Sequence, residues 1–290
     1  DRGYFSGFHS PKAVMPRLLR ELRSSFLPPL MVYLAAGISG LTAIVGTFFV
    51  KDYLGLSAEF LAGLAFWAGL PWALKMPLGH LVDLIWRWKA GLVYLGAGLI
   101  AASLTIMIGL LADPAAMRAY ASVEAWYVLA ALLSPVGYVM RGGGAEGMAG
   151  GAVPPADDGG QRLAGDTRRS MHTTMQTLGR VAIIGGGLLV SLVNVVMLRG
   201  VQNLPERARL DTYIAVHELA LLIPIVSVLG VLLATALRRR AGARMFAQGR
   251  ARAEVDARTE TRVERPPVNW WVLGGGLAFA LVSITVGLGG

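Results

Sequence analysis

Long apolar runs separated by short charged segments constrain this chain more than any other feature of its sequence. A helix needs about 20 consecutive apolar residues to cross a bilayer, because the hydrocarbon core is about 30 Å thick. The sequence has such runs at 27–50, 59–78, 90–112, 123–141, 171–198, 213–237 and 269–290. We therefore expect an all-α fold, a polytopic transmembrane helix bundle with seven spans.

The composition agrees with a protein embedded in a lipid bilayer. Hydrophobic residues make up 54% of the chain and charged residues 16%, whereas an average soluble domain has about 25% charged residues. The sequence has no cysteine, which excludes thiol nucleophiles and thiolate metal sites. Its four histidines lie in separate segments, without a metal-ligand spacing or a Ser-His-Asp arrangement. We expect no enzyme activity, no metal and no cofactor.

The distribution of cations predicts the orientation, because Lys and Arg accumulate in cytoplasmic loops. With the amino terminus inside, twenty cations fall in the cytoplasmic segments, while the outer segments hold five, namely Lys51, Arg118, Arg199, Arg207 and Arg209. We therefore expect a protein of the cell inner membrane with a cytoplasmic amino terminus. The net charge of +9 then faces anionic lipid. We expect no nucleic-acid partner, since no basic patch is interleaved with aromatic residues.

These assignments predict four parts along the chain. We expect a cytoplasmic arm at 1–26, a six-helix transmembrane bundle at 27–237, a basic cytoplasmic linker at 238–268 and a seventh helix at 269–290 that could start a second bundle. Small residues within the spans, such as the glycines at 37, 96 and 185–187, predict close helix contacts. Pro224 predicts a bend in the sixth span, because proline lacks a backbone N–H and clashes with the preceding turn.

A short charged segment joins the second span to the third. Gly79, three intervening residues and Asp83, followed by Arg87 and Lys89, predict a tight turn that holds a carboxylate and two cations at the membrane surface. This pattern resembles the cytoplasmic loop between the second and third helices of major facilitator superfamily transporters. The resemblance implies a gating role for these residues.

The residues before this segment narrow the resemblance. Pro71, Trp72 and Lys75 make the stretch similar to the P-W-x-x-K-P-x-x-G-x-x-x-D run of the folate–biopterin branch of the superfamily. Met76 stands where that branch usually has proline, and Pro77 follows one place later. The resemblance implies a major-facilitator-like amino-terminal six-helix half plus one further helix, and adds Lys75 to the gating motif.

A glycine-rich segment follows the fourth span. Residues 141–170 contain almost no large apolar side chain, which predicts a flexible cytoplasmic loop. In the folate–biopterin branch the fourth span ends in an acidic run similar to Q-D-V-V-x-D-A-x-x-x-E. Aligned with it, this chain keeps an acid only at Glu146, and Gly142 and Gly151 stand where the branch has carboxylates.

Polar residues within the spans are the expected substrate-binding set. Arg180 lies in the predicted fifth span and shares a helix face with Gln176, while Asn194 lies further along the same span. In a facilitator-type bundle such a stripe would line the central cavity, where arginine suits an anionic group. Tyr33 and Glu146 complete the set. Alternatively, Arg180 extends to the headgroups and is an anchor.

Two functions are compatible with these residues. The first is alternating-access transport of a small anionic or amphiphilic solute. The second is a structural subunit or assembly factor, derived from a transporter and associated with other membrane subunits. The glycines at 142 and 151, and a sequence that stops after seven spans, favour the second function.

The predicted orientation can be tested with single cysteines, because the chain has none of its own. Cysteines at Gly160 and Gly249 should be protected from an impermeant thiol reagent in intact cells, and a cysteine at Gln202 should react. Labelling of Gly160 from outside would contradict the orientation.

Overall fold

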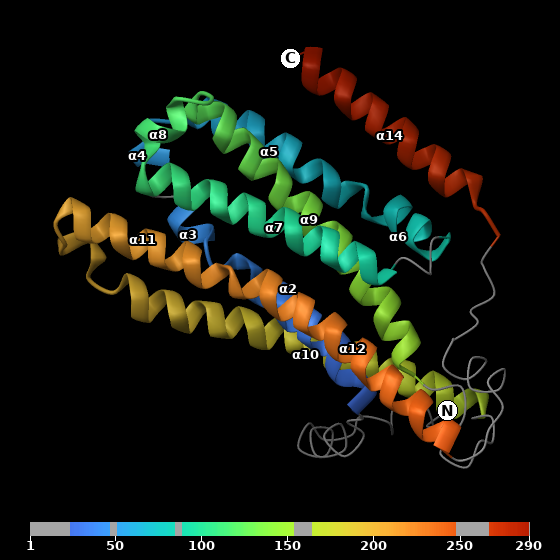
Figure 1. The fold of residues 1–290 in the computed structure, drawn as a ribbon. Coiled ribbons are helices and arrows are strands. Elements are labelled where there is room, and N and C mark those ends of the chain that lie inside the picture. The colour runs from blue at the N-terminus through green and yellow to red at the C-terminus, as the bar shows by residue number, and fades with distance from the viewer. Residues whose placement is uncertain (1–23, 47–50, 85–88, 154–163, 248–266, 290) are drawn as a thin grey trace, which may run out of the picture.

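The structure is a computed structural model that describes residues 24–46, 51–84, 89–153, 164–247 and 267–289 (Figure 1). Over these residues the chain is helical and contains no strand, which confirms the expected all-α class. Five segments are long and apolar enough to cross a membrane: Ser24–Val45, Ala90–Ala112, Val123–Ala152, Gly165–Asn203 and Glu206–Ala243. The predicted amino-terminal arm and most of the predicted linker lie outside the described residues.

The first two predicted spans are divided into shorter helices. The first is preceded by η1 (Ser24–Phe26), contains α2 (Leu27–Gly37), η2 (Ile38–Gly40) and α3 (Ala43–Val45), and is followed by α4 (Lys51–Leu54). The second, predicted as one helix over 59–78, consists of α5 (Ala58–Ala73) and α6 (Lys75–Leu84). Pro77 explains the interruption at Leu74, because its ring clashes with the carbonyl group of Ala73, four residues earlier.

The sixth predicted span is interrupted in the same way. It consists of α11 (Glu206–Ala220) and α12 (Leu222–Ala247). Pro224 is the third residue of α12, as Pro77 is of α6. The backbone N–H of Leu221 bonds to the carbonyl of Glu218 at 3.0 Å, which closes the end of α11 in a tighter turn. The helix is therefore interrupted at Leu221, where the sequence predicts a bend.

The remaining helices include α9 and α10, the two longest among the described residues. The full set is α7 (Lys89–Ala112), α8 (Pro114–Arg118), α9 (Val123–Ala152), α10 (Gly165–Leu198), η5 (Val201–Asn203) and α14 (Trp270–Gly289). The predicted loop over 141–170 is wrong for 141–152 and 165–170, because α9 continues to Ala152 and α10 begins at Gly165, and residues 154–163 lie outside the described residues. Tertiary packing explains the difference. The small residues after Arg141 give α9 a smooth face, and Ala145 and Met148 on it pack against α2, α7 and α12.

The long helices form two layers. In the first layer α5, α9, α2 and α10 lie in that order, and each packs on the next. α9 and α10, which have α2 between them, barely touch. In the second layer α7 covers α9 and α12 covers α2, and these two covering helices pack on each other. Figure 1 shows α14 along the α5–α6 edge of the bundle. The backbone N–H of Asn269, before α14, bonds to His80 Nε2 in α6 at 2.9 Å.

Glycines set the spacing between the paired helices. A Cβ atom at Gly96 of α7 would lie 2.5 Å from the carbonyl oxygen of Gly137 in α9. On the α2–α10 pair, a Cβ at Gly186 would lie 2.7 Å from the Cα atom of Gly37. Such contacts bring backbones directly together, as in membrane helix pairs that use small residues.

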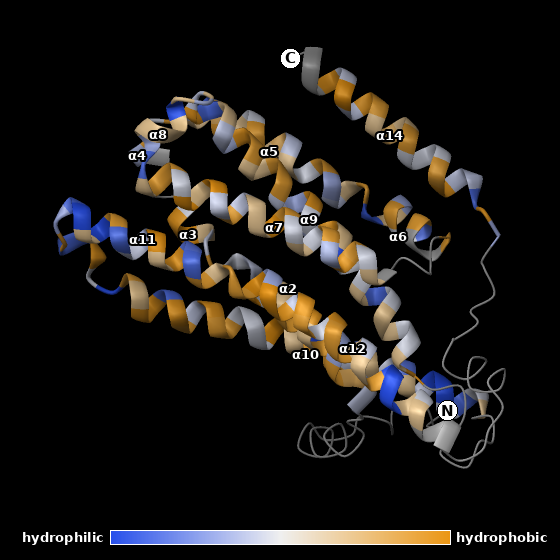
Figure 2. Cartoon of the chain, in the orientation of Figure 1, coloured by the Kyte–Doolittle hydropathy of each residue, from blue (hydrophilic) through white to orange (hydrophobic). Residues whose placement is uncertain are grey.

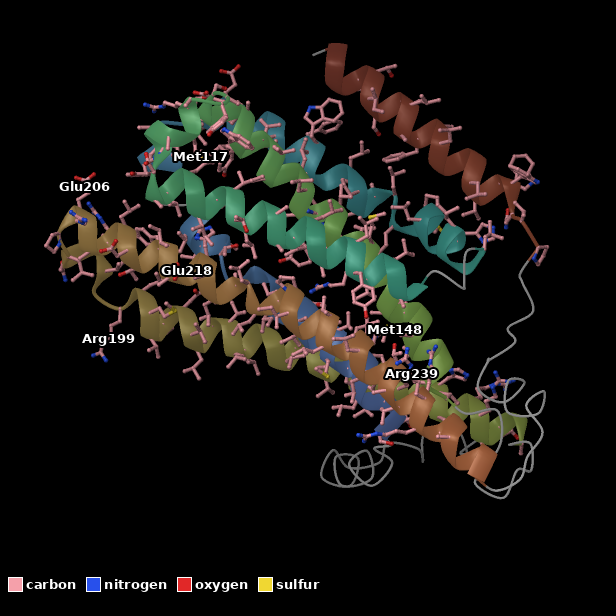
Figure 3. The ribbon with its side chains drawn as sticks, in the orientation of Figure 1. Met117, Met148, Arg199, Glu206, Glu218 and Arg239 are labelled. Carbon is pink, nitrogen blue, oxygen red and sulfur yellow. The ribbon has the colours of Figure 1, made fainter. Side chains whose placement is uncertain are left out.

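The surface has the pattern of a protein that crosses a bilayer. Figure 2 shows hydrophobic residues along the middle of the long helices and hydrophilic residues at the ends of the bundle. On α10 the exposed fraction of Leu188 is 68% and that of Val196 is 69%. Figure 3 places Arg199 and Glu206 at one end and Arg239 at the opposite end. The structure is thus compatible with a multi-pass membrane protein.

Alanine at Gly96 should destabilise the bundle, because its Cβ would overlap the backbone of α9. Overpacking of this kind costs about 1–3 kcal/mol. The melting temperature of the purified protein should therefore fall. Gly98→Ala is the matched control on α7, since a Cβ there meets no atom within 4 Å. Equal melting temperatures for the two variants would contradict the glycine contact.

Candidate functional site

A pocket of about 440 Å³ lies between α2, α9 and α10. Four of the five residues predicted to bind substrate line it, namely Tyr33, Glu146, Gln176 and Arg180. The other lining residues are Ala149, Gly150, His172, Met175, Gly179 and Ile183. Side chains from the first and fifth predicted spans and from the predicted loop over 141–170 are thus brought to one place, and we take this pocket as the candidate functional site.

The pocket exists because α9 and α10 are both attached to α2 but not to each other. α10 packs closely along α2, whereas its contact with α9 is slight. Tyr33 of α2 occupies the space between them. A Cβ atom at Gly179 would lie 2.9 Å from the ring atoms Cδ2 and Cε2 of Tyr33, so the ring rests on the glycine backbone. Gln176 and Arg180 lie one turn apart on the same face of α10.

Arg180 lies where the polar part of α10 meets its apolar part. Residues 181–198 are almost entirely apolar and would extend about 27 Å as a helix, close to the thickness of the hydrocarbon core. Residues 165–180 include Arg168, Arg169 and His172. Arg180 is exposed and has no hydrogen-bond or ion-pair partner among the described residues. Its guanidinium group is therefore free to bind a ligand.

Glu146 makes an ion pair that the sequence did not predict. Lys75 Nζ of α6 lies 2.9 Å from Glu146 Oε1 of α9, and the two side chains are 46% and 53% exposed. The same two residues line a second cavity of about 50 Å³ between α6, α7 and α9. Sequence analysis assigned Lys75 to gating and Glu146 to substrate binding. The structure places them together, beside the larger pocket.

The predicted gating turn is wrong in its conformation. Gly79 and Asp83 lie inside α6, and Gly79 also lines the smaller cavity. Pro77 explains the helix, because proline favours the first turn of a helix, where no N–H bond is needed. The side chains of Asp83 and Lys89, and the whole of Arg87, lie outside the described residues, so their contacts stay a prediction.

Asn194 is the predicted substrate-binding residue that does not join the others. Its side chain is 4% exposed and lies in the apolar part of α10, away from the pocket. Its Oδ1 atom has no hydrogen-bond partner among the described residues. The neighbouring side chains Val190 and Val193 pack against the main hydrophobic core. Asn194 is therefore a buried polar residue of the bundle.

Arg141 is the polar residue that sequence analysis misplaced. We counted it as a loop cation, yet it is 1% exposed, in the middle of the bundle. Its Nη1 donates to Ser227 Oγ of α12 at 3.2 Å, and its guanidinium carbon lies 4.9 Å from the ring centroid of Tyr138. The hydroxyl of Tyr138 donates to the carbonyl of Ser39 in η2 at 3.3 Å. Arg141 thus links α9 to α12, and Tyr138 links α9 to η2.

The Arg141 contacts could not be predicted from the sequence, because they involve helices distant in the chain. Gly96 and Gly137 pack closely beside Arg141, and a Cβ at Gly96 would lie 2.7 Å from the backbone nitrogen of Arg141. Removing Arg141 from the cytoplasmic cations leaves the predicted asymmetry large, since it was one of twenty.

Comparisons with known proteins do not identify a family. No protein-family model, no curated protein and no solved structure matches the chain. Within the described residues, no group of three or more His, Cys, Asp or Glu side chains could hold a metal ion.

The Lys75–Glu146 ion pair should contribute little to the free energy of unfolding, yet the effects of replacing the two residues should not be additive. A double-mutant cycle of Lys75→Met and Glu146→Gln should give a coupling energy of about 0.2–1 kcal/mol, because both side chains are half exposed. The coupling should decrease at high salt, where the charges are screened. Thermal unfolding of the four proteins measures it, and strictly additive effects would show that the pair does not form.

Proposed function

We propose that this protein is a transporter of the major facilitator type, an amino-terminal six-helix half plus one helix, that moves a small anionic or amphiphilic solute by alternating access. Arg180 binds the anionic group, with Gln176 and Tyr33 as further hydrogen-bonding groups. The observation that carries the proposal is the convergence of these side chains, from two helices, around an arginine without a partner among the described residues.

The chemistry of the pocket supports an anionic solute. A guanidinium group presents parallel N–H donors that match the two oxygens of a carboxylate or phosphate group. Met175 and Ile183 add apolar surface beside these donors. A volume of about 440 Å³ lies within the usual range for small-molecule sites, roughly 300–1,000 Å³.

The position of the pocket supports alternating access. Ala145 and Met148 of α9 pack toward α7 and α12, whereas Glu146 lines the pocket. The residues that line the pocket belong to α2, α9 and α10, and none belongs to the covering helices α7 and α12, so the pocket lies on the side of α2, α9 and α10. A second helix bundle on that side would enclose a solute between the two halves.

The broken helices support a moving element beside the pocket. α6 is separated from α5 at Leu74 and contacts α9 through the exposed Lys75–Glu146 pair. An exposed ion pair is weak, so it can break and reform during a conformational change. In the proposal, Lys75 and Gly79 of α6 belong to the gate, together with Asp83, Arg87 and Lys89.

One observation favours the second function, a structural subunit or assembly factor of a membrane complex. Among the described residues, Glu146 is the only acidic one that lines the pocket, and it is already paired with Lys75. The described lining of this pocket therefore offers no unpaired carboxylate that could couple transport to an ion. In this alternative, Arg180 contacts another membrane subunit instead of a solute.

Replacement of Arg180 tests the proposal. Arg180→Ala should lower uptake of labelled carboxylates and phosphate esters into proteoliposomes by at least about tenfold, the loss expected for one charged hydrogen bond. Arg180→Lys should retain part of the activity, because it keeps the charge and loses the planar fork. The matched control is Arg199→Ala, which directly follows the carboxyl-terminal end of α10 and is also exposed (Figure 3).

The outcome separates the two functions. Normal uptake by Arg180→Ala would contradict the transport proposal. If no form of the protein transports these anions, and Arg180→Ala instead weakens co-purification with other membrane proteins while Arg199→Ala does not, the structural-subunit alternative is favoured.

A further inference from the structure

Both signs of charge line the same pocket. Arg180 contributes an exposed guanidinium group from α10, and Glu146 contributes a carboxylate from α9. Tyr33 lies between the two helices that carry them, on α2. A pocket built only for an anion would gain nothing from a carboxylate in its wall, because like charges repel.

The carboxylate of Glu146 is accessible although it is paired. Lys75 approaches it from α6 and lines the smaller cavity, not the larger pocket. Glu146 lines both, and its side chain remains 53% exposed. A carboxylate has two oxygens and can accept hydrogen bonds from several donors. A cationic group in the larger pocket can therefore bind Glu146 from the side opposite Lys75, or replace it.

The uncharged lining fits the space between the two charges. Met175 and Ala149 offer apolar contact, and Gln176 and Tyr33 offer an amide and a hydroxyl group. Neither Gln176 nor the Tyr33 hydroxyl has a hydrogen-bond partner among the described residues. A ligand with a short apolar chain between two charged ends would satisfy all of these groups.

We infer that the ligand of this pocket is zwitterionic, with its anionic group bound by Arg180 and its cationic group bound by Glu146. The inference rests on the proposed function of the same pocket and narrows its substrate class. A zwitterion pairs both charges, whereas an anion or a cation alone leaves one of them unfavourably placed.

Two sources can supply such a ligand. One is a free zwitterionic solute, such as an amino acid or a betaine. The other is the headgroup of a zwitterionic phospholipid, because Arg180 lies where the apolar part of α10 begins. Both present an anionic and a cationic group a few bonds apart, and the experiment below distinguishes them.

Direct binding to the purified full chain in detergent tests the inference. The probes are ω-amino carboxylates of two to six carbons, compared with the carboxylate and the amine of the same length, by titration calorimetry. The best amino carboxylate should bind at least about tenfold more tightly than its matched carboxylate, because it adds a charge-assisted hydrogen bond. Glu146→Gln should abolish this preference and leave binding of the simple carboxylate unchanged or stronger.

Further variants give independent readouts. Lys75→Met should increase the affinity for the amino carboxylate, because the competing ammonium group is removed, and it does not alter the larger pocket. Arg180→Ala should abolish binding of both acids. Melting temperatures show whether each variant is folded. If Glu146→Gln is not folded, Lys75→Met serves as the test.

Each outcome decides a different statement. Equal affinity for the amino carboxylates and the matched carboxylates would overturn the zwitterion inference and leave the anionic-solute proposal standing. No binding of any acid would overturn both, and so would binding of the amines alone. If amino carboxylates bind, their affinity is then compared in two kinds of nanodisc. An affinity at least about tenfold lower in phosphatidylcholine nanodiscs than in phosphatidylglycerol nanodiscs identifies the zwitterionic headgroup as the competing ligand. Equal affinity in the two identifies a free solute.

Discussion

Direct backbone contact at paired glycines is the constraint on which the bundle depends. Gly96 and Gly137 bring α7 against α9, and Gly37 and Gly186 bring α2 against α10. In lipid there is little hydrophobic drive between helices, so close van der Waals contact takes its place. α9 packs along α7 and α10 packs along α2, so α9 and α10 stay apart, and the pocket lies between them.

The same packing seals Arg141 into the interior. Its contacts to Ser227 and to the Tyr138 ring replace water around the guanidinium group, although Nε has no partner among the described residues. Removing a charge from water is costly, so the residue is stable there only because several helices surround it. Arg141 and Arg180 thus have opposite environments. The first joins helices inside the bundle, and the second is exposed in a pocket that can receive a ligand.

Much of the fold and part of the site could be predicted from the sequence. The apolar runs predicted the helical class, and i, i+4 spacing placed Gln176 and Arg180 on one face of one helix. Prediction failed after Arg141, where high glycine content suggested a loop. Glycine has a low intrinsic helix propensity, but in α9 that cost is offset by contacts that neighbouring helices make with its small residues. Local composition carries no information about such neighbours.

The sequence by itself determined the all-α class, the long apolar segments and the interruption before Pro224, because hydrophobic length and the missing proline N–H act within a few residues of the chain. Only the tertiary structure decided which polar residues meet. It paired Lys75 with Glu146, buried Asn194 and placed Tyr33 beside Gly179. The physical reason is that these contacts depend on the rotation and spacing of separate helices, which are set by packing between segments distant in the chain.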